Sequence, residues 1–114
     1  MVDLVDFNMH RPPILPVRMP GEKGVLIHVT VPTLGLIREV QDRLPEYMNL
    51  EQKGVAERIK ESYDLAARLI SSNLDGLTVT AEDLRDKYDC TRYDLMTFYR
   101  AYVSFLTELQ NAKN

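Results

Sequence analysis

The sequence has little cysteine, histidine or glycine, and each shortage excludes a kind of site. Its single cysteine, Cys90, allows no internal disulfide, and the two histidines, His10 and His28, lie far apart. Neither histidine has a second histidine or a cysteine at ligand spacing, so the sequence predicts no metal site. The five glycines form neither a GxGxxG nor a GxxxxGK phosphate loop, so no nucleotide cofactor is expected.

Candidate catalytic groups are equally few. A nucleophilic pair of Cys90 with a histidine would need a proximity that the sequence does not provide, and no neighbouring residue predicts a lowered thiol pKa. Asp83, Asp86 and Asp89 recur at every third position. This spacing matches neither a calcium loop nor a hydrolase carboxylate pair, and a solvated face is the simpler interpretation. We therefore predict no catalytic residue, no cofactor and no enzymatic activity.

The chain also lacks an excess of positive charge and a long apolar run. Over 114 residues the formal net charge is −3, which disfavours nucleic acid or anionic lipid as the main partner. No segment approaches the roughly 18 apolar residues of a membrane span, and the start, MVDLVDFNMHRPP, lacks the order of a signal peptide. With 45% hydrophobic and 27% charged residues, the sequence predicts one folded domain. The single cysteine and the absence of a signal-peptide pattern make a reducing cytosol the expected location.

The amino-terminal part predicts an extended arm followed by a β-hairpin. Residues 1–13 combine acids, asparagine and prolines and are expected to form the arm. Residues 14–31 predict the hairpin, with ILPVRM and VLIHVTV as strands and PGEKG as the loop. Pro16 suits only an edge or the start of a strand. Because a lone hairpin is marginal in water, it must lean on helices or pair with another chain.

Helical periodicity and capping signals predict four helices after the hairpin, at about residues 33–44, 50–72, 80–88 and 92–110. Thr33 is the expected N-cap of the first helix, and Pro45 is expected to end or kink it. The expected fold class is therefore mainly α (α+β), in a single domain over residues 14–110.

The last two helices are marked most clearly in the sequence. Asp75 and Gly76 form a turn pair, and Thr80 and Thr91 each precede an aspartate by three residues, which is the spacing of a capped helix start. Cys90 is expected in the turn between these helices.

The helix predicted at residues 92–110 has an unusually wide apolar face. On one side gather Leu95, Phe98, Tyr99, Tyr102, Phe105, Leu106 and Leu109, with Met96 and Val103 extending the arc. The arc covers about half the circumference, whereas a surface helix usually needs a stripe of roughly 100°. The helix should therefore pack on two sides. Either both belong to the domain's own core, or one binds another chain through a set that includes Met96, Tyr99, Tyr102 and Val103.

A helix-turn-helix interpretation of residues 80–109 is also open. This segment carries four basic and six acidic residues. Because DNA affinity depends largely on neutralising phosphates, the charge argues against a DNA-binding regulator.

Several stretches together resemble the tail assembly chaperones of long-tailed (siphovirus-type) bacteriophages. They are VTVPTLGLIREV, ARLISSNLDG, a VT-x-EDL helix start and DLMTFYRAYVSFLTEL, and the resemblance covers residues 14–109. It implies a small α-rich protein in the host cytoplasm that coats the tape measure protein and helps the tail tube polymerise around it, without catalysis or cofactor. It also implies a longer form made by frameshifting near the end of the reading frame.

Exposed apolar surface on such a protein predicts self-association as well, because large apolar patches rarely stay bare. The main alternative is a structural, self-oligomerising tail or connector module that uses the hairpin as an inter-subunit strand. A DNA-binding regulator is the weaker alternative.

Overall fold

The computed structural model describes residues 13–21, 23–48 and 55–112. Most of the arm expected at residues 1–13 and the beginning of the helix expected at residues 50–72 lie outside these ranges. Within them, the structure confirms a mainly helical single domain that begins with a two-stranded hairpin and continues with four helical elements.

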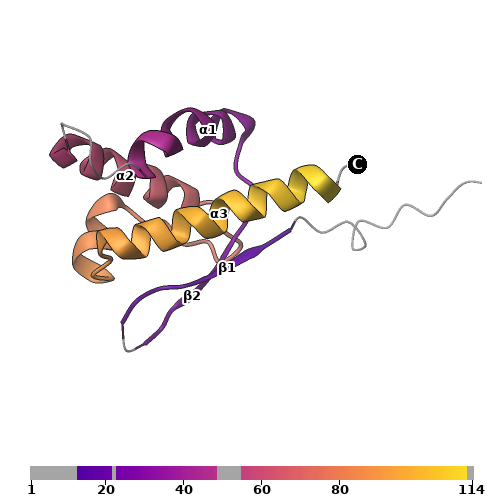
Figure 1. Cartoon of the computed structure of the whole chain (residues 1–114). Coiled ribbons are helices and arrows are strands. Elements are labelled where there is room, and N and C mark those ends of the chain that lie inside the picture. The colour runs from indigo at the N-terminus through magenta and orange to yellow at the C-terminus, as the bar shows by residue number, and fades with distance from the viewer. Residues whose placement is uncertain (1–12, 22, 49–54, 113–114) are drawn as a thin grey trace, which may run out of the picture.

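Helix α2 (Val55–Ile70) is the central element of this domain. It contacts α1 (Leu34–Met48), α3 (Arg92–Ala112) and strand β2 (Leu26–Val29), while α3 also contacts strand β1 (Leu15–Arg18). In Figure 1, α3 crosses the middle of the molecule with α1 above it and the hairpin below. The apolar side of α2 is buried accordingly, in agreement with the predicted amphipathic pattern: it contributes Tyr63, Leu65, Ala66, Ala67, Leu69 and Ile70 to the core.

The hairpin packs one face on the helices. β1 and β2 are antiparallel, with Leu15 opposite Val29 and Val17 opposite Ile27. Ile27 and Val29 are completely buried, and their partners on β1 pack against the same core. Gly21 has a φ of 118°, a conformation that side chains with a Cβ rarely adopt. The predicted hairpin is therefore present, with strands shorter than the expected range of residues 14–31.

Both edges of the hairpin are protected. On the outer side of β2, the Thr30 N–H donates to the Ser72 carbonyl at 2.8 Å, and the Leu74 N–H donates to the His28 carbonyl at 3.0 Å. The segment after α2 thus lies beside β2 like a short third strand. On β1, Met19 donates to Val25, so strand alternation turns the nitrogen of Pro16 away from β2, where no donor is needed.

Helix α1 continues through Pro45, so the predicted end of this helix near Leu44 is wrong. A proline in a helix interior removes one hydrogen bond and crowds the preceding turn. The last turn is nevertheless held by Tyr47, which is only 8% exposed. Its ring lies 6.4 Å from the ring of Tyr99, and its hydroxyl donates to Glu61. Tertiary packing here outweighs the local signal.

The N-caps predicted at Thr33, Thr80 and Thr91 are present. The Leu36 N–H donates to the Thr33 hydroxyl at 3.3 Å. At both later helix starts the capping is reciprocal, because the threonine hydroxyl accepts from the aspartate N–H while the aspartate carboxylate accepts from the threonine N–H. The pairs are Thr80 with Asp83 and Thr91 with Asp94. Aspartate therefore completes a capping box in which glutamate is the usual residue.

The helix predicted at residues 80–88 is a short α-helical turn followed by a π-helical turn, η1 (Asp83–Lys87). The Tyr88 N–H donates to the Asp83 carbonyl at 2.9 Å, and the Cys90 N–H donates to the Leu84 carbonyl at 2.8 Å. Between them Asp89 has a φ of 51°, in the left-handed region that aspartate tolerates better than most residues. This turn reverses the chain, so that α3 runs back across the domain.

Candidate functional site

The four residues predicted to bind a partner do not form one surface. Tyr99 is 2% exposed and Tyr102 is completely buried, whereas Val103 is 39% exposed and Met96 is half-buried. The interpretation that α3 presents its two tyrosines on a free side is therefore wrong for this structure. They belong to the core because α3 packs against both α2 and β1.

The two buried tyrosines differ in how their hydroxyls are bonded. The Tyr99 hydroxyl donates to the backbone carbonyl of Ser62 on α2. The Tyr102 hydroxyl has no hydrogen-bond partner among the described residues, and its ring lies 5.6 Å from Phe98 and 5.8 Å from Phe105. Burial raises the pKa of both phenols well above the usual range, so both stay protonated. Tyr99 joins α3 to α2, and Tyr102 fills space.

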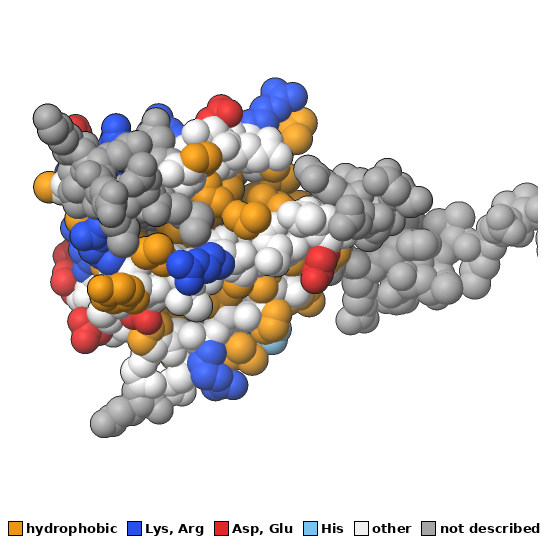
Figure 2. Space-filling view, in the orientation of Figure 1, with side chains coloured by type: hydrophobic (Ala, Val, Ile, Leu, Met, Phe, Trp, Pro, Cys, Tyr) orange, Lys and Arg blue, Asp and Glu red, His pale blue; other side chains and the backbone are white. Residues whose placement is uncertain are grey.

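Val103 lines an apolar groove between α1 and α3. The groove has a volume of about 310 Å³, and its walls are Val40, Gln41, Leu44 and Pro45 from α1 with Val103, Leu106 and Thr107 from α3. None of these side chains is charged. Figure 2 shows hydrophobic side chains gathered in the furrow between the two helices. In this groove a predicted partner-binding residue, Val103, meets other apolar side chains.

A second, smaller groove of about 250 Å³ runs between β1 and α3. Leu15, Val17 and Phe98 contribute apolar walls, and Cys90 lies at its η1 end. Burial raises the pKa of the Cys90 thiol to about 11, with Asp94 and Asp89 adding to the shift. The thiol is therefore protonated at neutral pH and is not an activated nucleophile, which agrees with its prediction as a small residue in the turn.

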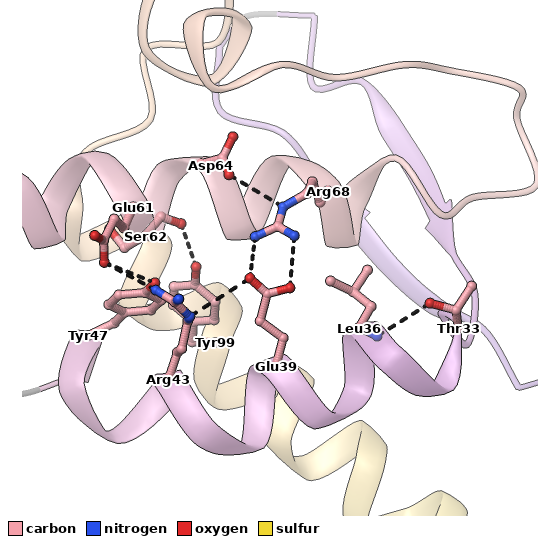
Figure 3. A network of polar contacts seen from close by, with 10 residues as sticks. All are labelled: Thr33, Leu36, Glu39, Arg43, Tyr47, Glu61, Ser62, Asp64, Arg68 and Tyr99. Atoms are coloured by element: carbon pink, nitrogen blue, oxygen red, sulfur yellow. Dashed lines mark hydrogen bonds and ion pairs between the residues drawn. The ribbon is translucent and has the colours of Figure 1, made fainter.

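A charged face spans α1 and α2, and the meeting of charged side chains from these two helices was not predicted from the sequence. It surrounds a hollow of about 460 Å³ that is lined by four acidic and four basic side chains. The Arg68 guanidinium donates to both oxygens of Glu39, at 2.7 and 2.8 Å, as Figure 3 shows. Arg68 lowers the pKa of the Glu39 carboxyl through these hydrogen bonds. The two residues are 29 positions apart, so only the register of α1 on α2 brings them together.

A further ionic contact holds the hairpin to the segment after α2. The Asp75 carboxylate accepts from the His28 N–H at 2.7 Å and lies 3.1 Å from the His28 Nδ1 atom. The pKa of Asp75 is lowered, first by the backbone N–H of His28 and then by its ring. His28, which the sequence left without a role, thus contacts the turn aspartate that precedes Gly76. The contact is structural, because it continues the pairing along β2.

Acidic residues of the described chain serve structural roles and do not form a metal cluster. Across residues 13–21, 23–48 and 55–112, no three His, Cys, Asp or Glu side chains gather closely enough to hold a metal ion. Asp83 instead serves as a capping residue, and Asp89 occupies the left-handed turn. None of the described helices has the length and apolar content needed to cross a membrane.

Comparisons of the chain with known protein families, with curated proteins and with solved structures return no match. The described chain is a mainly helical domain that carries two apolar grooves along α3 and one charged face across α1 and α2.

Proposed function

We propose that this chain is a non-enzymatic tail assembly chaperone of a long-tailed phage, which binds the tape measure protein in the host cytoplasm and assists tail tube assembly. The observation that carries the proposal is the uncharged apolar groove between α1 and α3, with Val103 exposed at its side. The layout of hairpin and helices, over which the sequence resembles this family, supports the same proposal.

The groove suits an apolar helical segment of a client. Its walls are two helices, and its lining is made of valine, leucine and proline with only Gln41 and Thr107 as polar groups. An amphipathic helix commonly binds such a groove with its apolar face, through side chains three and four residues apart. A mostly apolar lining with few hydrogen-bonding groups accepts many related sequences, which a protein that coats a long client needs.

Co-expression with a phage tape measure protein tests the proposal. We expect the two proteins to co-purify and the client to stay soluble. Val103→Lys should abolish co-purification without unfolding the chaperone, because Val103 is 39% exposed. Ser104→Lys is the matched control: it adds the same charge at the next, exposed position, which does not line the groove. Equal capture by wild type and both variants would exclude this groove as the client site.

The main alternative is a structural, self-oligomerising tail or connector module. It is favoured by apolar side chains left exposed on the hairpin, namely Val25 and Leu26 at 36% and 39%. Strand exchange between subunits is disfavoured, because Ser72 and Leu74 occupy the outer edge of β2 and Pro16 lies on the edge of β1. Light scattering separates the two proposals: a closed ring that forms with or without client, and leaves the client insoluble, would favour the module.

A DNA-binding regulator is the weakest alternative. Asp94 caps the start of α3, so a carboxylate stands where a recognition helix would approach phosphates. Binding to duplex DNA with a steep salt dependence would revive this alternative.

A further inference from the structure

Helix α1 is attached to the domain through few apolar side chains. Among its described side chains, Val40, Leu44 and Tyr47 are buried, and Leu34 is 64% exposed. Helix α2, of similar length, buries six apolar side chains among those that the structure describes. The two helices therefore contribute very unequally to the core: α2 lies at the centre of the domain, and α1 lies at its surface.

Two further features weaken this attachment. Pro45 cannot donate the hydrogen bond that an α-helix directs to the carbonyl four residues earlier, at Gln41. On the side facing α3, the apolar groove separates Val40 and Leu44 from Val103 and Leu106, so contact between the two helices is incomplete. Helix α1 consequently makes its most extensive contact with α2.

The α1–α2 contact is completed by ion pairs on its outer side. Glu39 meets Arg68 in the bidentate pair, and Arg43 bridges to Glu61 at 3.5 Å. All four side chains are partly exposed, at 29% to 48%. Exposed ion pairs are weak and are screened by salt, unlike buried apolar contacts. The strength of this contact therefore depends on ionic strength.

Beneath the ion pairs, α1 covers aromatic surface. The Tyr47 ring lies over Tyr99, with ring centroids 6.4 Å apart, and Figure 3 shows both rings on the side of α2 that faces α1. Tyr99 is fixed independently, because its hydroxyl is bonded to α2. Removal of α1 would expose Tyr99 and the apolar side chains of Val40 and Leu44 without breaking the α2–α3 contact.

We propose that α1 is a latched cover: it opens as a unit from α2, controlled by the Glu39–Arg68 pair, and uncovers Tyr99 and the wall of the apolar groove while α2 and α3 stay folded. The opening of α1 does not depend on the proposed function. The further statement, that the uncovered face enlarges the client site, does rest on the proposed function. In the open form Tyr99, one of the tyrosines predicted to bind a partner, becomes accessible to the client.

Hydrogen exchange, read by mass spectrometry on the full chain, tests the opening. Amides of residues 36–44 should exchange faster than those of residues 60–70 and 95–105. In Glu39→Gln the exchange of α1 should rise about threefold or more at low salt, while the other two helices keep their wild-type rates. Glu108→Gln is the matched control, since it removes an exposed charge on α3 with which the described residues form no ion pair. Wild type in 0.5 M NaCl should behave like Glu39→Gln.

Two results would contradict the proposal that α1 opens as a cover. One is exchange of α1 at the same rate as α2 and α3, which means that the domain opens only by global unfolding. The other is an α1 rate that responds neither to salt nor to Glu39→Gln nor to Arg68→Gln. Co-purification of the tape measure protein by Glu39→Gln is then measured separately. Faster α1 exchange without client capture by any variant would support the cover and contradict the proposed function.

Discussion

Helix α2 meets two helices in two different ways. Against α3 it makes a buried contact, in which Tyr99 is almost inaccessible to solvent and its hydroxyl donates to the Ser62 carbonyl. Against α1 it makes a contact with a small apolar centre and a border of partly exposed ion pairs. Buried apolar area is largely insensitive to salt and moderate changes of pH, whereas exposed ion pairs respond to both. The difference separates a fixed part of the fold from an adjustable one.

The largest expected effect comes from placing a charge in the buried contact between α2 and α3. Tyr99→Lys should lower the free energy of unfolding by at least about 3 kcal/mol, because the ammonium group is left buried and unpaired. Tyr93→Lys, on the same helix at a position that is 79% exposed, should change it by less than about 0.5 kcal/mol. Circular dichroism during urea unfolding measures both. A folded Tyr99→Lys protein of wild-type stability would show that the α2–α3 contact is not the fixed one.

A smaller effect separates the two buried tyrosines of α3. Tyr99→Phe should cost about 1 kcal/mol, because it removes the hydrogen bond to Ser62. Tyr102→Phe should be neutral or slightly stabilising, since its hydroxyl is buried without a partner in the described part of the chain. The two substitutions remove the same atom, so each is the control for the other in urea unfolding. Equal losses would contradict the assignment of Tyr99 as the bonded tyrosine.

The smallest effect is expected at the polar contact. Glu39→Gln should cost about 0.5–1 kcal/mol at low salt and less in 0.5 M NaCl. The sign of the pH dependence follows from Arg68, which lowers the pKa of Glu39 in the folded state. The stabilisation is complete above the ordinary pKa of 4.5 and is lost as the pH falls through the lower folded value.

Urea midpoints of wild type and Glu39→Gln, compared between pH 6 and pH 3, measure this dependence. The difference between the two proteins should shrink as the medium is acidified. A difference that stays constant with both pH and salt would mean that the ion pair adds nothing to the contact.

The sequence predicted best those features that depend on neighbouring residues. The Thr80 and Thr91 caps were predicted because cap and first turn lie within four residues of each other. The end predicted at Pro45 was wrong because the deciding contact, Tyr47 with Tyr99, comes from a distant helix. The width of the apolar arc on α3 indicated two packed sides, but periodicity cannot tell a core neighbour from another chain. The Glu39–Arg68 pair depends on the packing register of two helices, which no local pattern contains.

The edge contact between β2 and the segment after α2 has a consequence for how the chain folds. His28 accepts a hydrogen bond from Leu74 and donates one to Asp75, 47 residues further along the chain. The hairpin therefore cannot complete its pairing until α1 and α2 have been made and have brought this segment back. During synthesis the first strands leave the ribosome with one edge open and gain their last partner only after α2 emerges. A chain interrupted before residue 72 would display that edge to its neighbours.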